Sequence, residues 1–323
     1  MAVTTRRTID PVGALFGLGI PVLCAVGVVW LTSAWTPRLP SEIATHWSGT
    51  AADSFGSPMS TAWTMALLIL LIGGGCCAIA ALAQAQLMMR RYMLVIGLTV
   101  TFLMLAVQVA TLASQLDVTD PADVRFPAWS LGVGTVTGAV VGWVGARLLR
   151  DGRPRTPATR RPDPSLPRGP AELPLVEQVG TGTGTTAVVA LVVLVPVVLV
   201  CGALGSVWPI LVAAPLLIVV LGLLRFTVTV DETGLSVRNL GADAVFYGID
   251  EVVGAKVTRT RPFQDWGGWG MRVKGRGRYG LVTNTGPALV VTTESGQEFT
   301  VTTRRAQEMA GALNTLADRR DPD

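Results

Sequence analysis

The stretch Leu39–Ser57, LPSEIATHWSGTAADSFGS, separates two long apolar runs and holds the only histidine of the chain, His46. The run before it, Val12–Trp35, and the run after it, Ala62–Ala83, contain no charged side chain. A helix needs about 20 residues to cross the hydrocarbon core of a bilayer, and both runs reach this length. We therefore expect the stretch to be a polar loop between the first two membrane spans.

Two further apolar runs, Tyr92–Gln115 and Ala128–Leu149, are also long enough to span a bilayer. Half of the 323 residues are hydrophobic, which is typical of a chain with several spans and one soluble domain. The first run is too long for the apolar part of a signal peptide and lacks a small-residue cleavage site, so it is predicted to be retained. Residues 1–150 are thus expected to form a four-helix membrane domain with the loop 36–61 inside it.

Basic residues cluster in alternate connections of these spans. They lie before the first span, between the second and the third, and at or after the end of the fourth: Arg6, Arg7, Arg90, Arg91, Arg147, Arg150, Arg153, Arg155, Arg160, Arg161 and Arg168. Basic loops stay in the cytoplasm, so the pattern predicts a cytoplasmic N-terminus and an extracytoplasmic Leu39–Ser57 loop.

Residues 151–185 are rich in proline and arginine, which disfavours a regular helix or a central strand. They are predicted to be a cytoplasmic linker, either solvated or in contact with anionic lipid. Residues 186–225 follow as a predicted transmembrane hairpin, Thr186–Leu204 and Val207–Leu224. Two full spans would bring the total to about six, and a re-entrant pair added to four spans would give the same sidedness.

From Phe226 the apolar pattern alternates with a period of two, which predicts strands. About seven strands are expected, followed by an amphipathic helix over Arg304–Asp318. The order of these elements and the phrases VDETGLSVR (230–238), WGGWGMR (266–272) and GPALVVTT (286–293) resemble a bacterial pleckstrin-homology-like domain. The predicted fold is therefore a multi-pass α-helical membrane protein with a small cytoplasmic β domain, residues 226–323, capped by one helix.

The loop between the first two spans resembles the signature of a family of bacterial membrane proteins that carry domain of unknown function 1648, a domain also found in Sdp-type toxin-immunity proteins. The matching residues are Leu39, Pro40, Ile43, Thr45, His46, Trp47, Asp53, Phe55, Gly56 and Ser57. Two places depart from the pattern: Ala51-Ala52 stands where a glycine usually precedes the aspartate, and Pro58 stands where a basic residue often follows. The resemblance covers roughly the first third of the chain and implies a bacterial plasma-membrane protein.

The candidate recognition residues in this loop are Pro40, His46, Trp47, Asp53 and Gly56. Their roles are open between hydrogen bonding inside the loop, ligand binding or pH sensing, and metal binding. The metal alternative would combine His46 and Asp53 with Glu42, which shares a helical face with His46 if Ser41–Trp47 is helical.

Enzymatic and transport functions are disfavoured by what the sequence lacks. It contains no His-Glu-x-x-His, Gly-x-Ser-x-Gly, P-loop or dinucleotide-binding pattern, so no enzyme, cofactor or metal is predicted. The four cysteines lie inside apolar runs, without the spacing of a zinc site. The first three spans carry no ionisable side chain at depth, whereas coupled transporters usually do.

Small residues recur at a spacing of four on two predicted spans, and in the first span these are Gly13 and Gly17. Gly134, Gly138 and Gly142 are spaced by four in the fourth span, which places them on one helical face. Such a stripe lets two helices approach closely. It indicates either tight packing within one bundle or a homodimer through these three glycines.

A basic, tryptophan-bearing stretch is the candidate lipid contact of the β domain. Its residues are Lys256, Arg259, Arg261, Trp266, Trp269 and Arg272, and Asp265 is the one acidic residue among them. We expect it either to contact anionic headgroups of the inner leaflet or to fold its tryptophans inward. Nucleic-acid binding is not expected, because the domain is close to charge-balanced elsewhere.

The leading functional hypothesis is a non-enzymatic membrane protein of the sensing, immunity or signalling type. Its exterior loop would recognise a peptide or protein ligand, and both termini would be cytoplasmic. The alternative is a structural or lipid-handling protein whose β domain docks on the inner leaflet. A transporter is the least favoured of the three.

Overall fold

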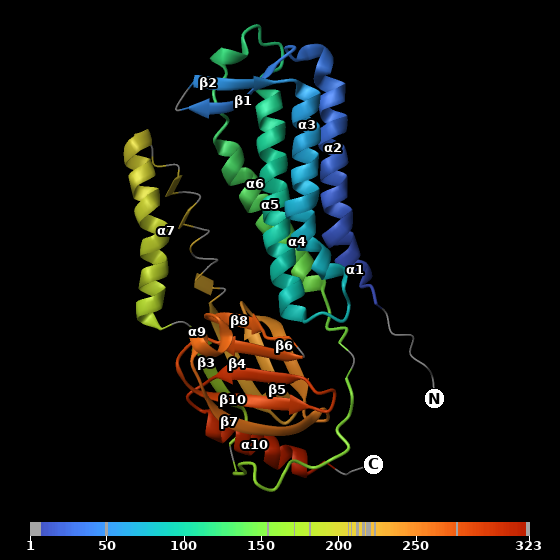
Figure 1. The fold of residues 1–323 in the computed structure, drawn as a ribbon, viewed down its shortest axis with the longest axis vertical. Coiled ribbons are helices and arrows are strands. Elements are labelled where there is room, and N and C mark those ends of the chain that lie inside the picture. The colour runs from blue at the N-terminus through green and yellow to red at the C-terminus, as the bar shows by residue number, and fades with distance from the viewer. Residues whose placement is uncertain are drawn as a thin grey trace. The chain divides into compact units, whose positions relative to one another are not determined.

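The computed structural model describes residues 8–48, 51–153, 155–170, 172–180, 182–205, 207, 209–210, 213–214, 217, 221–222, 224–275 and 277–320. The chain divides into two compact units, Met1–Pro154 and Arg155–Asp323. The first unit holds apolar helices and the second holds most of the strands (Figure 1).

The first unit is built from four long helical segments, two of which contain a π-helical stretch. In chain order its elements are α1 (Pro11–Ala14), η1 (Leu15–Gly19), α2 (Ile20–Trp35), η2 (Thr36–Arg38), β1 (Ile43–Ser48), β2 (Ala51–Gly56), α3 (Pro58–Leu68), η3 (Ile69–Gly74), α4 (Gly75–Ala78), η4 (Ile79–Ala81), α5 (Leu87–Ala113), η5 (Pro121–Asp123) and α6 (Trp129–Leu148).

Short polar residues fix where the helices begin. The Asp10 carboxylate accepts hydrogen bonds from the backbone N–H groups of Val12, at 2.9 Å, and Gly13, at 3.2 Å. These two donors would otherwise be unpaired at the start of α1. Ser57 caps α3 in the same way, and Pro58 occupies the first turn, where its missing N–H costs nothing. Pro58 is thus a helix-starting residue at the beginning of the second span.

Five described helical segments are long and apolar enough to cross a membrane: Pro11–Arg38, Pro58–Ala81, Leu87–Ala113, Trp129–Leu148 and Thr186–Ala203. Together with the sheets of the second unit they fit the predicted membrane protein with a β domain. The second half of the predicted hairpin, Val207–Leu224, lies partly outside the described residues.

The glycine stripe of α6 lies against α5. A Cβ placed on Gly134 would be 2.7 Å from the Cα of Leu103, and one on Gly138 would be 2.5 Å from the carbonyl oxygen of Leu98. Gly142 meets the α5 backbone at a similarly short distance. Helix backbones come this close only where a side chain is absent. The stripe therefore packs within the bundle, and a homodimer through the same glycines would require α5 to move away.

Arg90 lies fully buried where α5 begins, although the sequence identifies it only as a marker of sidedness. Its guanidinium donates to the carbonyl oxygens of Ala80, at 2.9–3.0 Å, and Arg150, at 2.9 Å, and it pairs with the carboxylate of Asp10. One side chain therefore ties together the start of the first span, the end of the second and the end of the fourth.

The second unit forms two sheets. The four-stranded sheet has the order β3-β4-β5-β6, with β3 (Leu175–Gly180), β4 (Arg225–Asp231), β5 (Gly234–Asn239) and β6 (Ala242–Gly248). The five-stranded sheet has the order β7-β10-β11-β9-β8, with β7 (Val252–Thr260), β8 (Gly270–Val273), β9 (Arg278–Val282), β10 (Gly286–Thr293) and β11 (Glu298–Thr302). Helices with defined bounds in the described part of this unit are α7 (Thr183–Leu204), α9 (Pro262–Trp266) and α10 (Ala306–Asp318).

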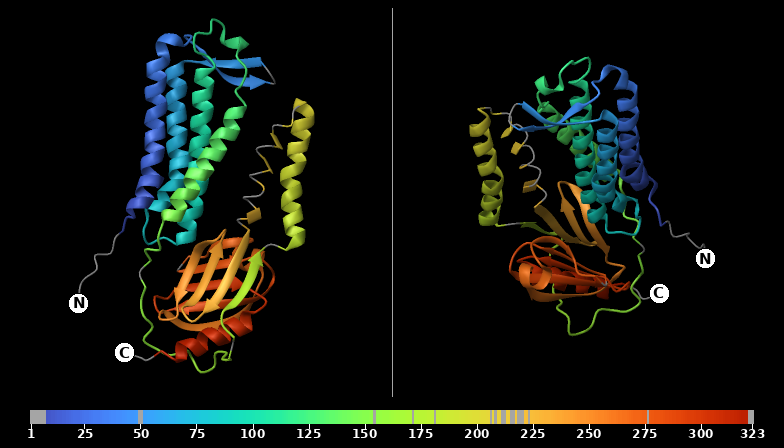
Figure 2. Two further views of the ribbon diagram at one scale, coloured as in Figure 1. Left: turned by 180° about the vertical axis from the view of Figure 1, so that it is seen from behind. Right: turned by 45° about the horizontal axis from the view of Figure 1, so that its top comes forward.

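Alternating side chains give each sheet one buried face. On β4, Phe226, Val228 and Val230 are buried, while the residues between them are partly exposed. Tyr247 of the first sheet and Phe299 of the second are fully buried with ring centroids 5.5 Å apart, so they join the two sheets. The helix α10 packs on β7 and β10, and Figure 2 shows it alongside the strands.

The segment 151–185, predicted to be a linker, contributes the edge strand β3. Leu175–Gly180 pairs antiparallel with β4, with Leu175 opposite Val230 and Gly180 opposite Arg225. Prolines dominate the composition of this segment, but they end at Pro174 and leave six residues free to donate and accept ladder hydrogen bonds. The described part of the second unit therefore has nine strands, where the sequence predicts about seven.

The preceding part of this segment is attached to the β domain rather than free in solvent. The N–H of Ala158 donates to the carbonyl oxygen of Asp250 at 2.7 Å, and Arg168 pairs with Asp318 of α10 at 2.9 Å. Proline excludes regular structure here, but it leaves backbone and side-chain groups able to bond to neighbours. Residues 155–169 thus run along the domain as an irregular strap.

Candidate functional site

The signature loop forms an antiparallel β-hairpin, β1–β2, at the end of the bundle where α2 ends and α3 begins (Figure 1). Ile43 and Ala44 are fully buried, whereas most other hairpin residues are exposed or half-buried. The register shifts on either side of His46, which increases the local twist of the strand. Because Ile43–Ser48 is a strand, Glu42 and His46 do not share the helical face on which the metal alternative depended.

His46 and Asp53 face each other across the hairpin. The distance from His46 Nδ1 to Asp53 Oδ1 is 2.6 Å, and the Ser48 hydroxyl donates to the other oxygen of the same carboxylate. The hydrogen bonds from Ser48 and His46 hold the pKa of Asp53 below its ordinary value. Both oxygens of this carboxylate therefore bond to the first strand, which makes Asp53 the polar clasp of the hairpin.

A pH dependence follows from this clasp. The pKa of Asp53 is lower in the folded hairpin than the ordinary aspartate value of about 3.9. Its contribution is therefore complete above that value and is lost as the pH falls through the lower folded value. We expect the protection factors of the hairpin amides, each relative to the intrinsic exchange rate at the same pH, to fall below roughly pH 4, and those of Asp53→Asn to be as low already at neutral pH. Equal protection of the Asp53→Asn and wild-type hairpins at neutral pH would contradict a clasp.

Trp47 anchors the hairpin to the segment that precedes α6. Its indole N–H donates to the carbonyl oxygen of Val124 at 2.7 Å, and its ring lies 5.4 Å from that of Phe126. A second anchor comes from the turn after α5, where Gln115 is fully buried. Its carboxamide accepts from the N–H of Ala44 at 2.6 Å and donates to the carbonyl of Ala44 at 3.2 Å, as a neighbouring strand would. The hairpin is thus fixed at both ends of β1.

A cavity of about 370 Å³ lies between the hairpin and the helices. It is lined by side chains of β1, α3, α5 and the segment before α6: Ala44, Thr45, His46, Trp47, Thr61, Met65, Val107, Gln108, Thr111 and Phe126. Gln108 is 3% exposed, and its Nε2 has no hydrogen-bond partner within the described part of the chain. A buried donor without an acceptor costs about 1–3 kcal/mol, so this amide is available to a ligand.

The predicted loop residues have different roles in this geometry. His46 and Trp47 line the cavity, and Asp53 orients His46. Pro40 lies before β1 and does not line the cavity. Gly56 ends β2, and a Cβ there would meet Thr45 at an ordinary 3.6 Å, so lack of space does not require glycine. No group of three or more His, Cys, Asp or Glu side chains that could hold a metal occurs among the described residues.

The sequence interpretation missed the glutamines as parts of the site. Gln108 lies on α5, and Gln115 lies in the turn just after the helix ends at Ala113. Two amides within and just after a predicted apolar span are a readable signal, because a buried polar group needs a partner. The contacts of Trp47 with Val124 and Phe126 cannot be read from the sequence in this way, since they depend on the path of the chain between α5 and α6.

The residues of the predicted lipid contact lie on β7, on β8 and on the segment between them, which includes α9. Lys256 and Arg259 lie on β7, while Arg272 lies on β8, and these strands are opposite edges of the five-stranded sheet. Trp266 packs against β9, where a Cβ on Gly280 would be 2.8 Å from its ring. Arg261 bonds to Gln264 of α9, and Trp269 is 44% exposed and pairs edge-on with Phe263 at 4.7 Å. The Trp266 ring therefore packs inward against the sheet, whereas the Trp269 ring stays exposed.

Helical segments able to span a membrane, followed by a two-sheet domain, define the architecture as that of a multi-pass membrane protein with a β domain. The family model of a domain of unknown function, DUF1648, matches residues 22–70, from α2 through the hairpin to η3. This match confirms the predicted resemblance over those residues. No curated protein and no solved structure matches the chain. The resemblance of residues 226–323 to a pleckstrin-homology-like domain stays a prediction.

Proposed function

We propose that the protein is a non-enzymatic sensor in the bacterial plasma membrane, whose hairpin and cavity recognise an extracytoplasmic ligand. The observation that carries this proposal is the unpartnered amide of Gln108 in a cavity walled by the anchored hairpin. The arginine pattern supports an exterior position for the hairpin. The same pattern supports a cytoplasmic position for both termini and for the β domain. The β domain would relay the signal of ligand binding or act as a scaffold.

The chemistry of the cavity favours a peptide ligand. Met65, Val107 and Phe126 offer apolar walls, and Gln108 offers one buried donor. A ligand that fits both needs an apolar side chain for the walls and a carbonyl oxygen for the Gln108 donor. Each apolar residue of a peptide carries both groups. The volume is at the lower end of the range for ligand pockets, so the cavity would take one or two residues of a longer chain.

Gln108→Leu separates recognition from folding. In the full chain purified in detergent, at least one member of a set of capped apolar tripeptides is expected to raise the apparent Tm of the wild type. Gln108→Leu should raise the Tm of the unliganded chain, because it removes a buried, unsatisfied amide that destabilises the fold by about 1–3 kcal/mol. It should also abolish the stabilisation by peptide, which is read from the shift in Tm.

Thr99→Val is the matched control for this substitution. Thr99 lies on α5, its hydroxyl donates to the carbonyl oxygen of Val95 in the same helix at 2.7 Å, and it does not line the cavity. This variant should keep the full peptide response. The proposal is wrong if no peptide stabilises the wild type, or if peptides stabilise Gln108→Leu equally well.

A further inference from the structure

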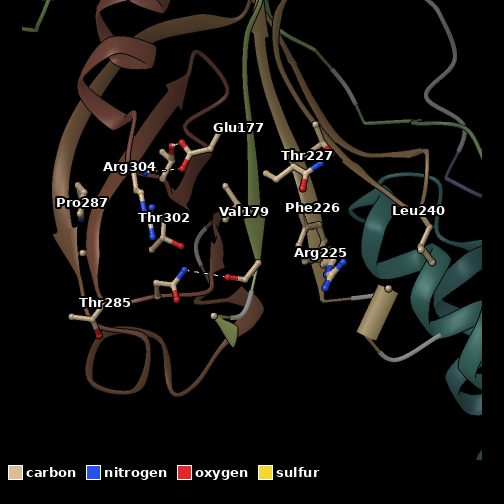
Figure 3. A pocket seen from close by; sticks show the side chains of 17 residues that line it. Glu177, Val179, Arg225, Phe226, Thr227, Leu240, Thr285, Pro287, Thr302 and Arg304 are labelled. Atoms are coloured by element: carbon tan, nitrogen blue, oxygen red, sulfur yellow. Dashed lines mark hydrogen bonds between the residues drawn. The ribbon is translucent and has the colours of Figure 1, made fainter. Parts of the chain in front are cut away.

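The β domain contains a second cavity, of about 1100 Å³, at the end of β3 (Figure 3). Its lining comes from β3, the start of β4 and the turns beside β10 and β11: Glu177, Gln178, Val179, Gly180, Gly182, Gly222, Arg225, Phe226, Thr227, Leu240, Asn284, Thr285, Gly286, Pro287, Thr302, Thr303 and Arg304. This cavity is separate from the basic, tryptophan-bearing stretch discussed above, since it shares no residue with it.

Among the described lining residues of this cavity, the charged side chains that remain available to a ligand are positive. Arg225 and Arg304 are both exposed, and among the described residues neither guanidinium has an ion-pair partner. Glu177 is the one acidic side chain among the described lining residues, and its oxygens already accept from the Thr303 hydroxyl and from the backbone N–H groups of Arg304 and Arg305. The carboxylate is thus committed to the fold, whereas the two arginines remain available to an anion.

Chain connectivity holds the cavity at the membrane surface. β3 ends at Gly180, and the apolar helix α7 begins at Thr183. β4 begins at Arg225, directly after the apolar stretch 207–224. Both segments reach the cavity wall, because Gly182, directly before α7, and Gly222, near the end of the second apolar stretch, line the cavity. A span that starts two or three residues from a cavity wall keeps that wall within the headgroup layer, because each residue reaches at most about 3.6 Å.

The start of α7 adds to the positive character. The first N–H groups of a helix have no acceptor within it, and they carry roughly half a positive charge. Gly182 is the N-cap of α7 and provides no side-chain acceptor. Two unpaired guanidinium groups and an uncapped helix start therefore border one cavity at the level of lipid phosphates.

We propose that this cavity binds the phosphate of an anionic phospholipid headgroup. The lipid would remain in the leaflet, with its phosphate between Arg225, Arg304 and the start of α7. Binding would tie the orientation of the β domain to the lipid composition of the membrane. This goes beyond recognition at the hairpin, and neither proposal depends on the other.

Lipid titration of the full chain, followed by native mass spectrometry from a neutral detergent, tests the site. The wild type should retain phosphatidylglycerol in preference to phosphatidylcholine. The double variant Arg225→Gln/Arg304→Gln should weaken phosphatidylglycerol retention about 25-fold, because each arginine near an anionic surface strengthens binding by a factor of about five. Both side chains are exposed and unpaired, so the variant is expected to keep the wild-type Tm.

Arg160→Gln/Arg161→Gln is the matched control, since it removes two exposed arginines of the same unit that do not line the cavity. It should retain phosphatidylglycerol like the wild type, and equal losses in both double variants would overturn the site. Glycerol 3-phosphate distinguishes a lipid from a soluble phosphate compound. If it displaces the lipid at equimolar concentration, the cavity binds soluble phosphates and the lipid assignment is wrong; if a large excess is needed, the assignment stands.

Discussion

Arg90→Met is expected to destabilise the first unit by about 3–5 kcal/mol, the range for removing one partner of a buried ion pair. Methionine keeps much of the length and apolar contact of arginine but has no donor. It leaves the carbonyl oxygens of Ala80 and Arg150 and the carboxylate of Asp10 without the guanidinium that they share. The measurement is the free energy of unfolding of the full chain in detergent, by titration with a denaturing detergent.

A double-mutant cycle with Asp10→Asn shows whether the pair is the cause. Burial alone would raise the pKa of Asp10, but hydrogen bonds from Arg90, Gly13 and Val12 bring it below the ordinary value. Asp10 therefore stabilises the fold as a carboxylate, above the ordinary aspartate pKa, and this contribution is lost on acidification. The double variant should cost less than the sum of the two single variants. Additive costs would mean that Arg90 acts through its carbonyl contacts alone.

Local periodicity explains what the sequence predicts well. The first five predicted spans and the strands predicted from Phe226 onward lie within a few residues of helices and strands of the structure, since a run of 20 apolar residues or an alternation of period two is set by neighbouring residues. Phe226, Val228 and Val230 alternate inward as expected. The strand Leu175–Gly180 is not predicted, because it is short and follows a proline-rich segment that favours an irregular linker over the whole of 151–185.

Contacts between distant segments explain what the sequence does not predict. Arg90 has the same local pattern as Arg91, and only the approach of residues 10, 80 and 150 makes it a buried hub. In the same way, Gln115 becomes an anchor because the hairpin lies over α5. His46 and Asp53 are readable as a pair of polar residues, but their contact requires the hairpin register, which a helical interpretation of Ser41–Trp47 would not give.

Gly138→Val is expected to destabilise the bundle by about 3 kcal/mol, at the upper end of the cost of overpacking. The new Cβ would lie 2.5 Å from the carbonyl oxygen of Leu98 and 2.6 Å from the Cα of Thr99. Both are backbone atoms, so no side-chain rotation relieves the clash, and α5 and α6 must separate. The measurement is the same unfolding titration, with the distance between the two helices followed by a pair of spin labels.

Gly27→Val is the matched control, because Gly27 lies in the apolar helix α2 and a Cβ there meets no atom within 4 Å. Both substitutions add the same β-branched side chain to a membrane helix, so their difference isolates the contact between α5 and α6. Gly27→Val should change the free energy of unfolding by less than about 1 kcal/mol. If Gly138→Val were equally mild, α6 would pack more loosely on α5 than the glycine contacts indicate. The stripe would then be accessible to a second copy of the chain, and an increase of dimer on cross-linking the wild type would reveal it.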